Sequence, residues 1–172
     1  PTLVNLIKPR INQRRPMKNL LHTTSPHTHK RQTTGQIMRL VALATLPGVV
    51  ALVIFFGWGV ITNIAIAISF ALLFEASAVK LRKQSIAFYL NDFSAVVTAI
   101  LLAIALPPYS PWWLIAVGIF FAIIVAKHFY GGMGYNPFNP AMVGYVVLLI
   151  SFPVLMTRWV SPSELFSGNT PN

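Results

Sequence analysis

The chain contains no cysteine, and only three of its 172 residues are acidic: Glu75, Asp92 and Glu164. Without cysteine, this chain offers no disulfide bonds and no thiolate ligands for zinc or an iron–sulfur cluster. Charged residues make up 9% of the sequence and apolar residues 55%, whereas about a quarter of the residues of an ordinary soluble domain are charged. These deficits argue against a soluble globular domain and favour a membrane protein.

The longest uncharged run extends from residue 40 to residue 74. As one helix it would measure about 52 Å, well beyond the roughly 30 Å of a bilayer core. The sequence Gly57-Trp58-Gly59 predicts a break within it, and Pro47-Gly48 predicts a kink before that break. We therefore expect an all-α membrane protein of about five transmembrane helices, over residues 37–56, 60–79, 86–106, 112–128 and 139–153.

Basic residues gather at the ends of the apolar segments. Eight of the 13 precede residue 40, and Lys80, Arg82 and Lys83 follow the second segment. A cytoplasmic N-terminus places twelve of them on the cytoplasmic side and only Arg158 outside, the arrangement that the positive-inside rule favours. A nucleic-acid-binding module would instead need one continuous basic face, so nucleic acid is not an expected partner.

The same distribution divides the chain into three parts. Residues 1–36 form a basic cytoplasmic arm, of which residues 1–16 are a candidate non-native extension. Residues 37–153 form the five-span membrane domain. Residues 154–172 form a polar tail outside the membrane.

The loop at residues 131–141 is the most unusual stretch, because it combines three glycines, two asparagines and two prolines between apolar segments. Irregular backbone at membrane depth is tolerated only where protein or water surrounds it, and it marks binding sites in transporters. Asn139-Pro140 predicts a capped helix start, whose N-terminus suits an anion such as phosphate. The alternative is a tight turn that connects two spans. The candidate residues of this structural or binding loop are Gly131, Gly132, Gly134, Asn136, Asn139 and Pro140.

Glu75 and Asp92 are the candidates for an ion path. A carboxylate at the bilayer centre costs roughly 2.5–3.5 kcal/mol and is a functional candidate by default. Glu75 lies near the end of its segment, so the alternative is that it reaches the membrane interface. For Asp92 the alternative is that Asn91-Asp92 caps the third segment.

The remaining polar residues carry weaker signals. Lys127 is interpreted as a snorkelling lysine that extends to the interface. No catalytic arrangement of side chains is readable. No metal site is predicted, because the arm's histidines lack a structural frame: His22, His27 and His29.

The stretch 127–141, KHFYGGMGYNPFNPA, resembles the D-subunit family of the Rnf/Rsx ion-translocating electron-transport complexes. This family is related to the B subunit of the sodium-pumping NADH:quinone reductase. Supporting stretches include FGWG at 56–59, LRKQ at 81–84 and PWW at 111–113, and the resemblance extends from about Met17 to the last residue. The form of residues 136–140 is closer to the Rnf protein than to the quinone reductase protein.

The resemblance implies a multi-pass subunit of the bacterial inner membrane, in a translocase that couples electron transfer to sodium or proton movement. It implies the A, B, C, E and G subunits and the lipid bilayer as partners. It further implies FMN bound covalently to a threonine beyond this chain. Ser167-Gly168-Asn169-Thr170 departs from the flavin-attachment pattern, so no FMN is expected on this chain itself.

The resemblance also implies two five-span halves of opposite orientation, of which this chain is the first. We therefore expect a C-terminally truncated fragment that is inactive when isolated. The alternatives are a quinone-reductase-type B subunit and a transporter or channel half-domain with no redox role.

The charge distribution generates a testable topology. A cysteine placed in the 107–111 turn should react with a membrane-impermeant thiol reagent only from the non-cytoplasmic side, because that turn follows the third predicted crossing. Reaction from the cytoplasmic side alone would reverse the topology.

Overall fold

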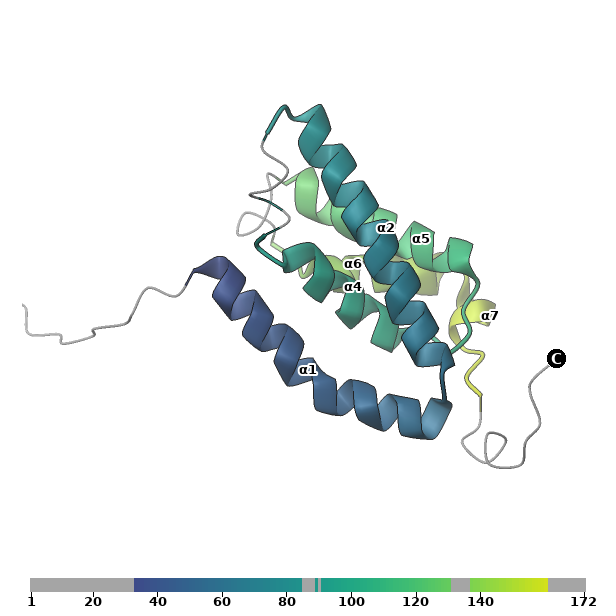
Figure 1. Ribbon diagram of the computed structural model, residues 1–172. Coiled ribbons are helices and arrows are strands. Elements are labelled where there is room, and N and C mark those ends of the chain that lie inside the picture. Colours follow the sequence, from purple (N-terminus) through teal and green to yellow (C-terminus); the bar gives the residue numbers. More distant parts are fainter. Residues whose placement is uncertain (1–32, 85–88, 90, 131–136, 161–172) are drawn as a thin grey trace, which may run out of the picture. The chain divides into compact units, whose positions relative to one another are not determined.

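The computed structural model describes residues 33–84, 89, 91–130 and 137–160. The chain divides into the units Pro1–Arg31 and Gln32–Asn172, and every described residue belongs to the second. The described elements are all helical, which confirms the all-α part of the prediction. In chain order they are α1 (Thr34–Phe56), α2 (Gly59–Leu81), α4 (Ser94–Ala105), α5 (Trp112–Phe120), the π-helix η3 (Phe121–His128), α6 (Pro140–Ser151) and α7 (Pro153–Met156) (Figure 1).

The predicted break in the long apolar run is confirmed. Helix α1 ends at Phe56 and α2 begins at Gly59. Between them Gly57 adopts a φ of 75°, a left-handed conformation that glycine reaches without steric cost. Each helix has 23 residues, or about 34 Å, so both are long and apolar enough to cross a bilayer. Pro47 lies inside α1, which bends along its length (Figure 1).

The fourth predicted segment, residues 112–128, is confirmed by α5 and η3, whereas the third and fifth differ from the prediction. Helix α4 begins at Ser94, and Phe93 just before it has a φ of 59° that interrupts a continuous helix. Residues 85–88 and 90 of the third predicted segment lie outside the described residues. The fourth spans α5 and η3, and the fifth is interrupted at Phe152, which separates α6 from α7. At 12 residues each, α4 and α6 reach only about 18 Å. Short, interrupted helices of this kind border ligand sites in membrane transporters.

Helix α2 packs against α4 and α5, and α6 packs against α5 and η3. The core is built from small and branched side chains, with alanines 67, 71, 95, 99 and 103 beside larger residues such as Leu102 and Ile119. Small residues let helix backbones approach closely when the surrounding lipid is as apolar as the side chains. By contrast, α1 has no buried residue.

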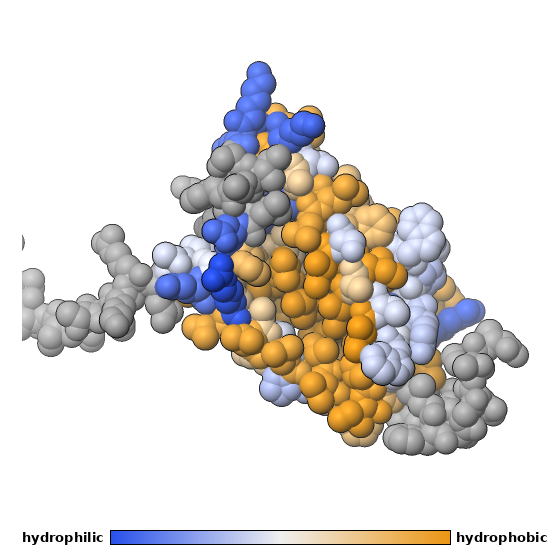
Figure 2. Space-filling view, viewed as in Figure 1, coloured by the Kyte–Doolittle hydropathy of each residue, from blue (hydrophilic) through white to orange (hydrophobic). Residues whose placement is uncertain are grey.

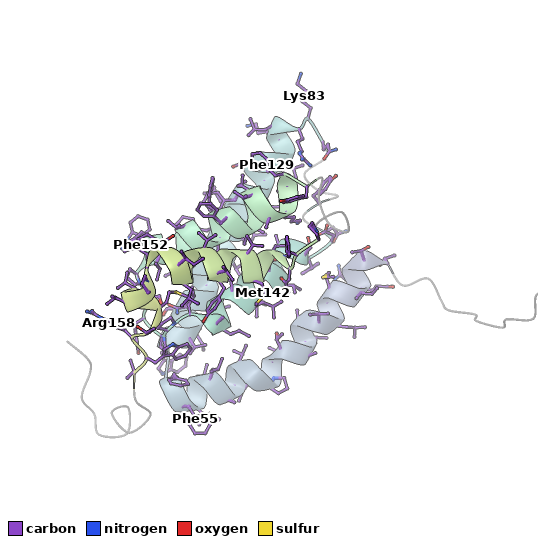
Figure 3. The ribbon with its side chains drawn as sticks, turned by 180° about the vertical axis from the view of Figure 1, so that it is seen from behind. Phe55, Lys83, Phe129, Met142, Phe152 and Arg158 are labelled. Atoms are coloured by element: carbon purple, nitrogen blue, oxygen red, sulfur yellow. The ribbon has the colours of Figure 1, made fainter. Side chains whose placement is uncertain are left out.

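Hydrophobic side chains cover most of the face in Figure 2, while hydrophilic ones gather at the start of α1 and the end of α2. Figure 3 shows Lys83 and Arg158 at opposite ends of the helices. An apolar band with polar ends is the pattern of helices that cross a bilayer.

The contact between α5 and α6 depends on two glycines. A Cβ at Gly144 would lie 2.5 Å from the carbonyl oxygen of Gly118. Gly144→Ala in the full-length protein should therefore force the helices apart and cost about 1–3 kcal/mol of unfolding free energy. SDS-titration unfolding measures this cost.

Gly48→Ala is the matched control, because a Cβ at Gly48 meets nothing within 4 Å. It should be neutral, or stabilising through better helix propensity. An equal loss from both changes would rule out close α5–α6 packing as the cause.

Candidate functional site

Three ionisable side chains from α2 and η3 lie together in the interior of the helical bundle. Glu75 of α2 is 0% exposed, and one of its carboxylate oxygens accepts a hydrogen bond from the Lys127 ammonium at 2.6 Å. The other oxygen lies 3.1 Å from Nε2 of His128. Lys127 and His128 are 2% and 4% exposed, so this is a buried ionic cluster.

The local helix geometry explains how two consecutive residues reach one carboxylate. In an α-helix consecutive side chains point about 100° apart. Lys127 and His128 end the π-helix η3, where the Phe129 N–H donates to the Ile124 carbonyl five residues earlier. The wider turn carries both side chains toward α2. π-turns occur frequently at functional sites.

The cluster extends to the start of α4. The Lys127 ammonium also donates to the Ser94 hydroxyl at 2.6 Å, and that hydroxyl lies 2.7 Å from Oδ1 of Asp92. Beside it, the Arg82 guanidinium donates to the His128 carbonyl. One polar network thus joins side chains of α2, α4 and η3 to Arg82 and Asp92, which lie between α2 and α4.

The interpretation of Lys127 as a snorkelling lysine is wrong. Its ammonium is buried and paired, because Glu75 lies at the same level of a neighbouring helix. Glu75 is likewise buried among the helices, and its depth relative to the membrane interface stays a prediction. A charge removed from water is retained only when it is paired and hydrogen-bonded, and this pair meets that condition.

Asp92 has the local role that the capping alternative gave it. Its Oδ1 accepts the backbone N–H of Ser94, the first residue of α4, at 2.9 Å. This bond satisfies one of the free N–H groups at the helix start. Its membership of an ion path stays a prediction.

The predicted helix start after the irregular loop is confirmed. The side chain of Asn139 accepts the Ala141 N–H at 3.0 Å, and Pro140 is the first residue of α6. Four of the loop candidates, Gly131, Gly132, Gly134 and Asn136, lie outside the described residues. The binding role of the loop therefore stays a prediction.

A cavity of about 430 Å³ brings the loop and the cluster together. Its polar wall includes Ser94, Thr98, Lys127 and Asn139, and its apolar wall comes from α1, α4 and residues 137–140. The predicted loop and the buried charges thus belong to one region of the protein.

A metal ion would require a group of metal-ligating side chains, and a covalent flavin would require an accessible threonine. No group of three or more metal-ligating histidine or acidic side chains occurs among the described residues, and the arm's histidines and Thr170 lie outside the described ranges. The threonine on the cavity wall, Thr98, is buried and donates its hydroxyl to the Ser94 carbonyl at 2.9 Å. It is therefore not a surface-accessible point for attaching a flavin phosphate.

Residues 21–172 match the profile of one protein family, described as NQR2, RnfD, RnfE. The chain belongs to this family. The match confirms the resemblance of the glycine- and asparagine-rich loop and its flanking stretches. Together with the apolar helices, it indicates a membrane protein.

Several curated proteins, each named as the D subunit of an ion-translocating oxidoreductase complex, are similar to this chain. The protein of Alcanivorax borkumensis is 56% identical over 162 residues, which cover 89% of this chain and 47% of the relative. Those of Vibrio atlanticus and Salmonella newport are 56% and 54% identical and cover 86% and 87% of this chain. The chain spans under half the length of these relatives.

Sequence reasoning found Glu75 but missed its partners. One signal was available: the second and fourth predicted segments run in the same direction. Glu75 and Lys127 therefore fall near the same membrane side. A lone acid and a lone base at matching depth predict a pair. His128 and Ser94 carried no such signal, because they depend on the π-turn and on where α4 begins.

Removing one partner should expose the cost of a buried charge. Lys127→Met in the full-length protein leaves Glu75 buried without its cation, which should cost about 3–5 kcal/mol of unfolding free energy. The double variant Glu75→Gln/Lys127→Met should lose less than Lys127→Met alone, because a neutral glutamine carries neither the cost of an unpaired buried carboxylate nor the cost of protonating one. SDS-titration unfolding of the three proteins measures both effects.

Lys80→Met on α2 is the matched control, because Lys80 is exposed and surface changes usually stay within about 0.5 kcal/mol. Equal losses at positions 80 and 127 would contradict the pairing.

Proposed function

We propose that this chain forms the first half of the membrane domain of an Rnf-type D subunit. The full-length protein would couple electron transfer to translocation of sodium ions or protons across the bacterial inner membrane. The family match and the similarity to proteins named as D subunits of ion-translocating oxidoreductase complexes support this proposal. The A, B, C, E and G subunits and the lipid bilayer complete the proposed setting.

The proposed topology has five crossings with a cytoplasmic N-terminus. The start of α1, the end of α2, the start of α4, the end of η3 and the start of α6 would face the cytoplasm. Because Lys127 is buried in an ion pair, the orientation signal rests on eleven basic residues before and after the first two segments. Eleven basic residues on the cytoplasmic side against one, Arg158, on the other still favour this orientation.

The observation that carries the proposal is the charged cluster of Glu75, Lys127 and His128. Ionisable groups inside membrane helices are rare and mark ion pathways and proton relays. Here they lie beside interrupted helices and a cavity, the setting in which transporters bind their ions. We therefore propose Glu75 and Asp92 as residues of the ion path.

The flavin belongs to the full-length protein in this proposal. FMN would be joined to a threonine outside this chain, as the resemblance of the sequence to the family implies. This chain's contribution is the helical framework and the ion path, and no step through the flavin is assigned to its residues.

Two other functions remain as alternatives: a quinone-reductase-type B subunit, and a transporter or channel half without redox activity. The form of residues 136–140 favours the Rnf type over the first. Electron transfer measured on the assembled full-length complex separates the proposal from the second.

The direct test is Glu75→Gln in the full-length protein within its complex. Ion translocated per electron should fall by on the order of tenfold, because the buried carboxylate is lost, while electron transfer continues. Membrane vesicles with a potential-sensitive dye and an electron-transfer assay measure both quantities.

Glu164→Gln makes the same chemical change in the predicted extramembrane tail and should leave the ratio unchanged. Unaltered ion movement in Glu75→Gln would remove Glu75 from the path. Absence of any electron transfer in the wild-type complex would contradict the redox assignment.

A further inference from the structure

A continuous hydrogen-bonded chain of five side chains leads from the buried cluster to the start of α4: His128, Glu75, Lys127, Ser94 and Asp92. We propose that it is a proton relay, in which the Ser94 hydroxyl connects the buried Glu75–Lys127–His128 cluster to an open end at Asp92. The inference rests on the proposed function. It goes further by naming protons as the ions that this path conducts and Ser94 as the linking residue.

The chemistry of the end groups fixes the direction of the central bonds. An ammonium can only donate hydrogen bonds, and an ionised carboxylate can only accept them. Ser94 Oγ lies 2.6 Å from Lys127 Nζ and 2.7 Å from Asp92 Oδ1. The hydroxyl must therefore accept from Lys127 and donate to Asp92, which is the arrangement required to pass a proton from the lysine to the aspartate.

The inner end of the chain has a free proton-accepting or proton-donating atom. His128 Nε2 faces Glu75 Oε2 at 3.1 Å, so with an ionised Glu75 it is Nε2 that carries the hydrogen. His128 Nδ1 is buried and has no hydrogen-bond partner among the described residues. An orphaned buried nitrogen is costly in a purely structural site. In a relay, this atom is the position where a further proton binds.

The outer end of the chain is open. Asp92 and Asn91 line a hollow of about 630 Å³ together with residues 33–36 and Arg39 at the start of α1. Ser94 and Lys127 line the cavity of about 430 Å³ instead, so the hydrogen bond between Ser94 and Asp92 connects the two spaces. Asp92 is partly exposed and can exchange protons with water.

The charged groups that face the chain come from three of the helices packed around α4 and from Arg82 just after α2, which donates to the His128 carbonyl. Helix α1 contributes Arg39, which bonds to Asn91 at 3.4 Å and lies 4.6 Å from the Phe93 ring centroid. Helix α2 contributes Glu75, and η3 contributes Lys127 and His128. Helices α5 and α6 carry no charged residue.

The transfer step is a simple exchange of protons. Lys127 Nζ gives one proton to Ser94 Oγ while the original Ser94 hydroxyl proton passes to Asp92 Oδ1. One N–H and one O–H bond break, and two O–H bonds form. The step leaves a neutral amine and a neutral carboxylic acid. Asp92 then releases its proton to water. An imidazolium at His128 gives its Nε2 proton to Oε2 of Glu75. After the carboxyl group rotates, this proton passes to Lys127 Nζ, which leaves a neutral imidazole, a carboxylate and an ammonium.

The test uses the full-length protein in its complex, in membrane vesicles with a fluorescent pH indicator. Electron transfer is recorded in the same sample. Ser94→Ala removes the linking hydroxyl but keeps Glu75 and Lys127. Protons moved per electron should fall by on the order of tenfold or more, and Ser94→Thr should restore them. Should Ser94→Ala fail to assemble, Ser94→Cys, with its weak S–H donor, is used and should show a reduced ratio.

Ser69→Ala is the matched control. Its hydroxyl donates to the Ala65 carbonyl of its own helix at 2.8 Å and joins no network with the cluster. This variant should keep the wild-type proton-to-electron ratio.

The outcomes separate the relay from the function on which it rests. An unchanged proton-to-electron ratio in Ser94→Ala overturns the relay. So does a wild-type complex that transfers electrons and moves sodium without protons, although the proposed function then stands. A wild-type complex with no electron-coupled movement of either ion overturns the proposed function and the relay together.

Discussion

The buried ion pair between Glu75 and Lys127 is the constraint on which the rest of the structure depends. Two charges taken out of water are tolerable only at close contact, and here the nitrogen and oxygen are 2.6 Å apart. The pair therefore fixes how the C-terminal parts of α2 and η3 lie against each other. Lys127 also donates a hydrogen bond to Ser94 at the start of α4. The contacts of one lysine therefore fix the relative positions of three elements that are distant in sequence.

The apolar packing is arranged to permit this contact. Alanines on α2 and α4, and the Gly118–Gly144 contact between α5 and α6, bring the helix axes close. The π-turn of η3 then directs both Lys127 and His128 toward α2. Short α4 and α6 leave room for the cavity that the capped start of α6 and the lysine both line. Close packing thus positions the ion pair, and the short, interrupted helices leave space for the cavity beside it.

Much of the fold could be predicted from sequence, because hydrophobic runs and glycine breaks act locally. The break at Gly57–Gly59, the cap at Asn139 and the all-helical class follow from such signals. The start of α4 at Ser94 could not be predicted in this way, since it depends on the left-handed conformation of Phe93. Lys127 was misinterpreted because snorkelling is a property of one residue, whereas its burial depends on a partner 52 positions away. The cluster, the cavity and the π-turn arise only from packing.

The structure pairs Glu75 with Lys127 among the helices, which requires an ionised carboxylate. Infrared difference spectroscopy of the full-length protein tests it most directly, with the Glu75 band assigned by its loss in Glu75→Gln. We expect a carboxylate band at neutral pH that shifts to a carboxylic-acid band in Lys127→Met, where the cation is gone. A carboxylic-acid band for Glu75 in the wild-type protein would contradict the ion pair and the site built on it.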